Sequence, residues 1–185
     1  MTKLHLGCGK RHIPGFVHVD LDDYPHIDHR HRVDQLPMFE DCSVELIYAS
    51  HVLEYFDRVQ VLEVLNEWRR VLSIGGTLRL GVPDFDALTT VYHKTGEIDR
   101  VLGPIFGRFE IAGLENSLAV LYHKTVYDYL SLKLILEENG FQKVRKWDWR
   151  ETLHKDHDDY SQAYFPHMDK DNGILISLNV EGDKI

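Results

Sequence analysis

Residues 4–9, Leu-His-Leu-Gly-Cys-Gly, constrain the fold more than any other part of the sequence. An apolar run enters two glycines one residue apart, Gly7 and Gly9, as in a buried strand that ends in a tight loop. Residues 16–20 read as a second short strand that ends in the carboxylate of Asp20. A glycine loop after one strand and an acid at the end of the next is an arrangement that holds a nucleoside.

The glycine pattern alone is also compatible with a plain tight turn. The dinucleotide-binding fingerprint has a third glycine, and residues 10–12 supply none. Residues 10–15, between the two expected strands, are too few for a normal crossover helix, so we expect one helical turn there at most. A nicotinamide-dependent dehydrogenase is therefore disfavoured, because its fingerprint needs a helix between the loop and the acid.

Charge and length restrict the classes of partner and compartment. The net charge is -9, from 21 Lys and Arg against 30 Asp and Glu, so we expect neither a nucleic-acid surface nor attraction to anionic lipid. The 185 residues suit one domain, 1–185. No apolar run is long enough to span a membrane and no leader pattern is present, so we expect a cytoplasmic protein. Cys8 lies in the glycine loop, so a disulfide to Cys42 is not expected.

Apolar spacing predicts alternating strands and helices. Strands are expected over residues 44–49, 77–82, 141–149 and 174–180, with a poor edge strand over 27–33. A helix over 57–72 carries an apolar face of Val61, Leu65, Trp68 and Leu72, begins with a capping box at Asp57 and Gln60, and stops at Gly75-Gly76.

The second half of the chain contains another helix and two irregular segments. A helix over 125–138 places Tyr127, Leu130 and Leu134 on one face and stops at Asn139-Gly140. Residues 95–119 form an insertion that is either a lid or substrate wall, or a packed surface excursion. Residues 150–173 form a long polar loop. The alternation indicates the α/β class with a doubly wound, mostly parallel sheet.

An ordered set of short motifs carries a family resemblance. The motifs are LGCG at 6–9, VD at 19–20, DQLP at 34–37, SHVLEYF at 50–56, EWRRVL at 67–72 with GG at 75–76, and VPD at 82–84. The set resembles the class I S-adenosylmethionine-dependent methyltransferases, and more narrowly the small methyltransferases associated with polysaccharide or cell-surface biosynthesis. The resemblance implies a seven-stranded Rossmann-like sheet with an antiparallel C-terminal strand. Relatives carry an acid or Asn where this chain has His5, and a glycine where it has Arg11.

The resemblance also implies S-adenosylmethionine as cofactor and a role for each matching position. Leu6, Gly7, Cys8 and Gly9 would form the loop under the methionine part, and Asp20 would bind the ribose hydroxyls. Asp34 would accept from the adenine amino group, with Gln35 and Leu36 lining the adenine. Ser50 and His51 would face the sulfonium and the acceptor.

Methyl transfer to a hydroxyl or amine also needs a group that removes a proton. Histidine has a suitable pKa, and ligands bind beyond the carboxyl ends of the strands, so His51 and, less favoured, Asp84 are the candidate catalytic residues. Glu54 and His154 are weaker candidates. The acceptor, a saccharide or small-metabolite hydroxyl in one interpretation, would meet residues 95–119 and 150–173. The aromatic residues there are Phe106, Phe109, Tyr160, Tyr164 and Phe165.

Two other functions stay open at this point. His26, His29 and His31, together with the patch of His154, Asp156, His157, Asp158 and Asp159, could hold zinc, although such residues are more often solvated. The chain could also be a methyltransferase-fold partner subunit that does not catalyse.

Overall fold

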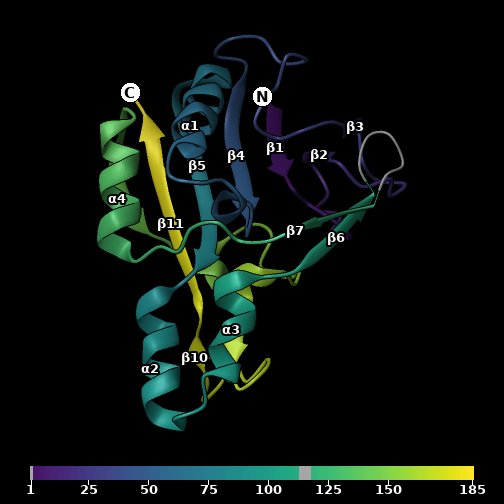
Figure 1. Cartoon of the computed structure of the whole chain (residues 1–185). Coiled ribbons are helices and arrows are strands. Elements are labelled where there is room, and N and C mark those ends of the chain that lie inside the picture. The colour runs from purple at the N-terminus through teal and green to yellow at the C-terminus, as the bar shows by residue number, and fades with distance from the viewer. Residues whose placement is uncertain (1, 113–117) are drawn as a thin grey trace.

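Seven strands of the computed structural model form one sheet in the order β3-β2-β1-β4-β5-β11-β8 (Figure 1). The structure describes residues 2–112 and 118–185. The strands are β1 (Thr2–Leu6), β2 (Val17–Asp20), β3 (His29–Arg30), β4 (Val44–Ser50), β5 (Leu72–Pro83), β8 (Phe141–Lys146) and β11 (Ser177–Lys184). β1 to β5 run parallel, and β11 is antiparallel to both β5 and β8. The predicted mostly parallel sheet with an antiparallel C-terminal strand is confirmed.

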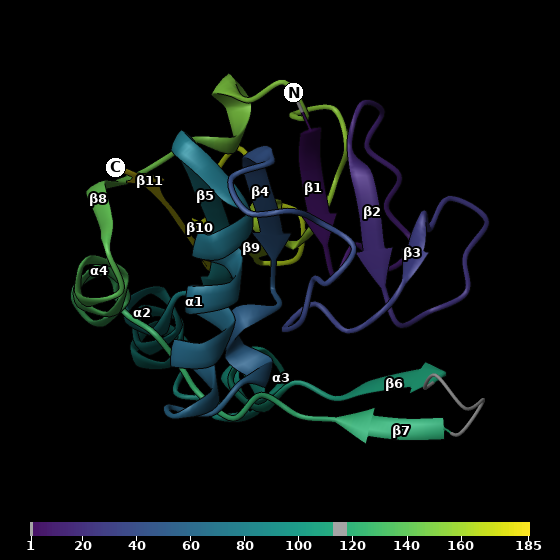
Figure 2. The ribbon, with the colours of Figure 1, turned by 90° about the horizontal axis from the view of Figure 1, so that it is seen from above.

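The helices lie in two groups. α1 (Gln60–Val71) and α4 (Tyr129–Glu138) cover one face of the sheet (Figure 2). α2 (Phe85–Thr95), α3 (Asp99–Phe106) and the hairpin of β6 (Phe109–Ala112) and β7 (Leu118–Leu121) lie beyond the carboxyl ends of the parallel strands (Figure 1). None of the described helices has the length and apolar content that crossing a bilayer requires.

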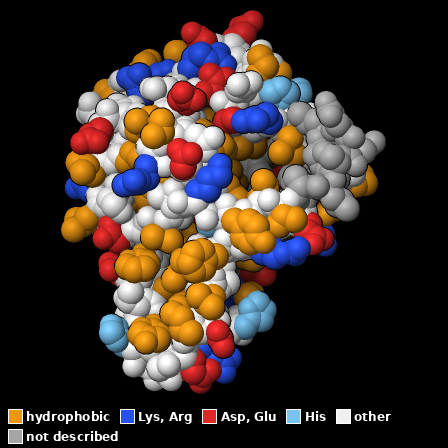
Figure 3. Space-filling model, in the orientation of Figure 1, with side chains coloured by type: hydrophobic (Ala, Val, Ile, Leu, Met, Phe, Trp, Pro, Cys, Tyr) orange, Lys and Arg blue, Asp and Glu red, His pale blue; other side chains and the backbone are white. Residues whose placement is uncertain are grey.

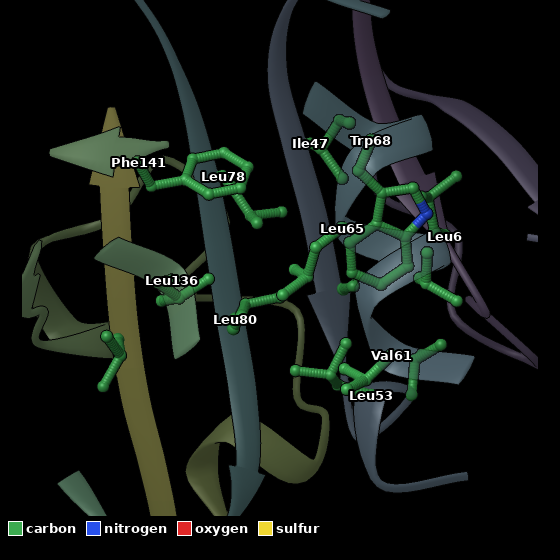
Figure 4. Close-up of a cluster of buried hydrophobic side chains, with 14 of the residues drawn as sticks. Leu6, Ile47, Leu53, Val61, Leu65, Trp68, Leu78, Leu80, Leu136 and Phe141 are labelled. Atoms are coloured by element: carbon green, nitrogen blue, oxygen red, sulfur yellow. The ribbon is translucent and has the colours of Figure 1, made fainter. Parts of the chain in front are cut away.

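The two faces of the sheet differ because side chains alternate along each strand. One set, which includes Leu6, Ile47 and Leu80, packs against Leu65 and Trp68 of α1 in the main core (Figure 4). The intervening residues are polar or aromatic and form the opposite face: His5, His18, Tyr48, Arg79, Asn179 and Glu181.

Residues 147–163, rather than a helix, cover this polar face. The Tyr48 hydroxyl donates to Asp159 Oδ2, and Asn179 Nδ2 donates to the Ser161 carbonyl at 2.9 Å. The His154 ring lies 4.3 Å from the Tyr48 ring, centroid to centroid. Several of the chain's histidines are therefore packing residues of a layer in which polar groups replace an aliphatic core.

The first crossover confirms the expectation of a helix-free connection. Residues 7–16 are all described and contain no helix, although β1 and β2 pair in parallel. β3 is the edge strand and is only two residues long. Both cysteines, Cys8 and Cys42, are free.

The predicted helix stop at Gly75-Gly76 is wrong. Asp57 Oδ1 does accept from the Gln60 amide at 2.9 Å, which supports the predicted start. α1 nevertheless ends at Val71, and Leu72 is already extended and belongs to β5. Gly75, at φ +80°, lies in an irregular stretch of β5 where the register with β4 shifts. The glycines serve a bulge in the strand instead of a helix cap.

The predicted buried face of the last helix is also wrong. α4 begins at Tyr129, after a capping box in which Asp128 and Ser131 bond reciprocally. Its buried residues are Leu132 and Leu136, whereas Leu130 and Leu134 are 73% and 56% exposed. The prediction aligned the face on Tyr127, which is buried but precedes the helix. The stop at Gly140, with φ +83°, is confirmed.

The irregular segments contain more structure than the sequence indicated. Residues 95–119 include α3 and the β6–β7 hairpin, and residues 113–117 lie outside the described part. The polar loop 150–173 contains a 3-10 turn at Tyr160–Gln162 and β9 (Tyr164–Phe165), which pairs with β10 (Ile174–Leu175).

Hydrophobic side chains gather on the surface over α2 and α3 (Figure 3). The exposed ones include Phe85, Tyr92, Ile98, Leu102 and Phe106.

Candidate active site

A cavity of about 510 Å³ opens at the carboxyl ends of β1, β2 and β4. The strand order reverses between β1 and β4, and this is where open α/β sheets bind ligands. The volume falls within the range of small-molecule sites. Of the residues predicted to form the site, Gly7, Cys8, Gly9, Asp20, Asp34, Ser50 and His51 line this cavity.

The two glycines of the loop differ in what surrounds them. Gly7 has φ +62°, and its amide donates to the Val19 carbonyl at 2.9 Å. A Cβ at Gly7 would lie 2.4 Å from a methyl carbon of Val52, so this glycine allows close packing. Gly9 has φ +50°, and the space where its Cβ would stand is open. Gly9 therefore presents bare backbone to the cavity.

Asp20 is held by the glycine loop. One carboxylate oxygen accepts from the Gly9 amide at 2.8 Å and the other from the Asp22 amide at 2.9 Å. The side chain is nearly buried but lines the cavity. Each oxygen keeps a lone pair for a further donor, such as a ribose hydroxyl.

Arg32 and Asp34 form the cavity wall beyond β3. Arg32 Nε donates to Asp34 Oδ1 at 2.9 Å. Burial raises the pKa of Asp34, but the hydrogen bond and charge of Arg32 outweigh it and leave that pKa below its usual value. Val33, between them, also lines the cavity.

Three of the predicted cofactor residues do not line the cavity. Leu6 points into the core on the α1 side of the sheet (Figure 4). Leu36 is likewise fully buried in the core, and its amide donates to Glu67 Oε1 at 2.6 Å. Gln35 is exposed outside the cavity. The chain turns away from the cavity directly after Asp34, and Val33 rather than Gln35 or Leu36 lines that wall.

His51 is fixed from several sides at the end of β4. It has φ +56°, an uncommon value for a residue with a side chain, and its amide donates to the Gly81 carbonyl at 2.7 Å. Its Nε2 lies 3.1 Å from Ser177 Oγ, and its Nδ1 lies 3.3 Å from Glu54 Oε1. Strained backbone of this kind often occurs at functional sites.

A hydrogen-bond chain assigns the proton on His51 Nε2. Asn179 Nδ2 donates to the Ser161 carbonyl, so Asn179 Oδ1 is free to accept from the Ser177 hydroxyl at 3.0 Å. The Ser177 oxygen then accepts from His51, and Nε2 carries the hydrogen. The other ring nitrogen, Nδ1, faces Glu54 Oε1 at 3.3 Å.

Glu54 is a fully buried carboxylate below the cavity floor. Within the described residues, neither of its oxygens has a hydrogen-bond partner that meets full geometric criteria. Besides His51, His123 Nε2 lies 3.8 Å from Glu54 Oε1. The sequence indicated Glu54 only weakly, and His123 not at all, because the contact between them spans segments far apart in the chain.

Asp84 and His154, the other candidate bases, are not in the cavity. Asp84 caps α2 by accepting from the Asp86 and Ala87 amides at 3.0 and 3.3 Å, and burial raises its pKa. His154 lies in the polar layer under the sheet, where burial lowers its pKa to about 4. The strand-end argument failed for Asp84 because the side chain turns back to cap the helix that follows.

The remaining wall of the cavity comes from distant segments. Phe109 and Tyr160, which the sequence indicated as aromatic acceptor contacts, both line it. Sequence reasoning assigned no site role to the other members of this wall: Lys10, Arg11, Tyr55, Phe56, Gln60, Leu121 and Lys124. His5 also lines the cavity, and burial, followed by the neighbouring His18, lowers its pKa well below the usual value.

The histidine-rich segments do not converge on a metal site in the described part of the chain. No group of three or more His, Cys, Asp or Glu there could hold an ion. The His29 ring instead packs edge-on against Phe39, and His26 stacks on Tyr24.

Comparisons with known proteins agree with this geometry. Residues 22–80 match the family model described as "Methyltransferase domain". No curated protein matches the sequence. Solved structures do match along almost the whole chain.

Three of these structures illustrate the likeness. A SAM-dependent methyltransferase from Archaeoglobus fulgidus is 14% identical, with TM-score 0.57 over 99% of this chain and 86% of the other. A methyltransferase from Mesorhizobium loti is 15% identical, with TM-score 0.52 over 99% and 90%. The Burkholderia thailandensis 1,6-didemethyltoxoflavin-N1-methyltransferase, solved with that compound and S-adenosylhomocysteine, is 12% identical, with TM-score 0.55 over 99% and 70%.

The chain has the class I methyltransferase fold. In this Rossmann-like fold the antiparallel last strand, here β11, lies between β5 and β8. The family match and the fold together support S-adenosylmethionine as the cofactor.

Proposed function

We propose that this protein is an S-adenosylmethionine-dependent methyltransferase that acts on a small-molecule acceptor bound in the same cavity. One observation carries the proposal. The open backbone of Gly9 and the carboxylate of Asp20 face one cavity at the point where the strand order reverses.

The proposed cofactor contacts follow the cavity wall. Gly7, Cys8 and Gly9 would lie under the methionine part, Asp20 would accept from the ribose hydroxyls, and Asp34 would accept from the adenine amino group. Ser50 would meet the cofactor near the sulfonium, since it is the last residue of β4 and lines the cavity.

The main contribution of the protein to methyl transfer would be to position the acceptor against the methyl group, because the cofactor itself would supply the reactivity. The acceptor oxygen or nitrogen attacks the methyl carbon, the carbon–sulfur bond breaks, and the electron pair stays on sulfur as S-adenosylhomocysteine forms. The acceptor must also release a proton. We propose that His51, which Glu54 and Ser177 hold at the cavity wall, receives that proton at Nδ1, because Nε2 already donates to Ser177.

Calorimetric titration with S-adenosylhomocysteine tests the proposed cofactor site. Saturable binding at one site per chain is expected, followed by S-adenosylhomocysteine release from S-adenosylmethionine when an acceptor is added. The absence of heat at high ligand concentration would overturn the proposal and favour a partner subunit without a cofactor. A saccharide acceptor, as in polysaccharide biosynthesis, is one arm of the acceptor panel, because Tyr55 and Tyr160 offer ring faces to a sugar.

A further inference from the structure

Three cationic side chains of the cavity wall are outside the salt bridges of the described part of the chain. Lys10, Arg11 and Lys124 all line the cavity, and none of them forms a salt bridge with the residues described. Acids outnumber bases by 30 to 21 in this sequence. Because acids are in excess, cations without a salt bridge are unexpected. The presence of three of them in one cavity indicates that the cavity binds an anionic ligand.

The carboxylates of the same cavity are already engaged. Asp20 accepts from two backbone amides, and Asp34 is paired with Arg32. Asp159 accepts from the Tyr48 hydroxyl and from the Ser161 amide at 2.8 Å. These carboxylates keep their charge, but other donors occupy their oxygens, and none of them forms a salt bridge with Lys10, Arg11 or Lys124.

S-adenosylmethionine would not neutralise the cations of the cavity. S-adenosylmethionine carries a sulfonium, an ammonium and one carboxylate, so it adds net positive charge. Its carboxylate belongs with the methionine part beside the glycine loop, where Lys10 is the adjacent cation. Arg11 and Lys124 then remain, and like charges in a partly desolvated cavity raise its free energy unless an anion joins them.

Arg11 and Lys124 line the same cavity, and other lining residues hold each of them. The Arg11 guanidinium lies 5.0 Å over the Tyr160 ring, and Tyr160 lies 5.3 Å from the ring of His51. The Lys124 amide donates to the Glu54 carbonyl at 2.8 Å.

Both cationic groups keep donors available. Arg11 uses Nε on the Asp158 carbonyl at 3.2 Å, and its terminal nitrogens make no hydrogen bond to a described residue. Lys124 Nζ donates only to the neutral amide oxygen of Gln60, at 2.9 Å, among the described groups. Charged donors of this kind bind carboxylate or phosphate strongly.

We propose that the methyl acceptor is an acid, a ring-containing molecule whose carboxylate or phosphate lies between Arg11 and Lys124. Its ring lies against Tyr160 and the neighbouring apolar wall of Tyr55 and Phe109, next to His51. This inference rests on the proposed function, because it assigns the acceptor end of the same cavity.

Matched probes separate charge from shape. Protein saturated with S-adenosylhomocysteine is titrated calorimetrically with 4-hydroxybenzoate, 4-hydroxybenzamide, tyramine and phenyl phosphate. We expect the two anions to bind at least about tenfold more tightly than the amide, and tyramine to bind most weakly. Comparison of the affinities of 4-hydroxybenzoate and phenyl phosphate distinguishes a carboxylate acceptor from a phosphate acceptor. Equal affinity for the amide, tighter binding of tyramine, or no binding of any probe would overturn the inference.

Two variants test the assigned cations. In Lys124→Met the ratio of the affinities for 4-hydroxybenzoate and 4-hydroxybenzamide should fall at least about fivefold. In Lys124→Glu tyramine should bind more tightly than 4-hydroxybenzoate. Lys133→Met, on the exposed side of α4, is the matched control and should keep the wild-type preference. An unchanged preference in both Lys124 variants would contradict the inference.

S-adenosylhomocysteine affinity is measured on every variant first. If that ligand fails to bind the wild-type protein, the proposed function fails. The anion preference is then still read on the protein alone, so the two failures are distinct.

Discussion

The Nδ1 atom of His51 lies 3.3 Å from Oε1 of Glu54, a carboxylate that is completely excluded from solvent. A buried carboxylate is costly unless a positive charge or a proton compensates it. His51 is the compensating group at the cavity wall, and Ser177 fixes its other nitrogen as a donor. The two residues therefore form one unit at the cavity wall, in which Glu54 and Ser177 hold the His51 ring.

Glu54→Gln removes the charge and keeps the shape of this unit. We expect methyl transfer to fall by about 10²-fold or more, because His51 loses the carboxylate that holds its ring in place. The affinity for S-adenosylhomocysteine should stay within about twofold, since Glu54 does not line the cavity. Rates are measured by S-adenosylhomocysteine release, with Glu137→Gln on the exposed side of α4 as control. A wild-type rate in Glu54→Gln would refute the role of Glu54 in positioning His51.

The glycine loop predicts different results for substitutions of equal size. Gly9→Ala and Gly96→Ala both place a side chain at positive φ, +50° and +69°, with open space at the new Cβ. Each should lower the free energy of unfolding by about 1–2 kcal/mol. Only Gly9→Ala should also weaken S-adenosylhomocysteine binding, because Gly96 caps α2 outside the cavity.

Chemical denaturation and calorimetry measure the two effects separately. Equal ligand affinity in Gly9→Ala and Gly96→Ala would show that the cofactor does not approach the Gly9 backbone. Gly7→Ala should destabilise more than either, since its Cβ would collide with Val52 at 2.4 Å.

Asp20→Asn tests the ribose contact. The amide keeps one acceptor oxygen, but its NH₂ group would face the backbone amide of Gly9 or of Asp22, both of which are donors. We expect S-adenosylhomocysteine affinity to fall by about 10–100-fold. Asp34→Asn should cost less, because Asp34 is already paired with the exposed Arg32. Calorimetric titration decides the order, and a larger loss in Asp34→Asn would contradict these assignments.

Local patterns predicted the parts of the fold that local chemistry determines. The β1 glycine loop, the carboxylate at the end of β2 and the stop at Gly140 each depend on a few consecutive residues. The buried face of α4 depends on which residues belong to the helix. Asp128, one residue after Tyr127, caps the helix and fixes its start at Tyr129. The prediction counted Tyr127 as a helical residue, and aligning the face on it led away from Leu132 and Leu136.

The acceptor end of the site lay beyond prediction because it is assembled from segments far apart in the sequence. Tyr55, Lys124 and Tyr160 meet in one cavity, and no spacing in the sequence links the three, although Tyr55 lies in the SHVLEYF motif. The sequence led us to consider histidines as metal ligands for a related reason. Alternation along β1 and β2 puts His5 and His18 on one face of the sheet, and loop residues such as His154 pack onto that face. The sequence shows a histidine-rich composition but not which groups cover that face.

The same layer makes stability depend on pH. Burial lowers the pKa of His154 to about 4 and of His5 and His18 below the usual value, although Asp159 opposes the shift at His154. In the unfolded chain these groups have a pKa of about 6.5, so on acidification the unfolded state binds protons first. The stability is therefore present above about pH 6.5 and is lost as the pH falls toward about 4 for His154.

His154→Phe should move the acid-unfolding midpoint to lower pH. The phenyl ring keeps the packing against Tyr48 and Trp147, and it removes two buried nitrogens that have no hydrogen-bond partner among the described residues. The change is worth at most about 3 kcal/mol near pH 4, and much less at pH 8. Urea denaturation at both pH values gives the difference, with His93→Phe, near the end of α2, as control. An equal stability change at both pH values would mean that His154 packs without titrating, because only a group protonated in the unfolded chain and neutral in the folded one gives a pH-dependent difference.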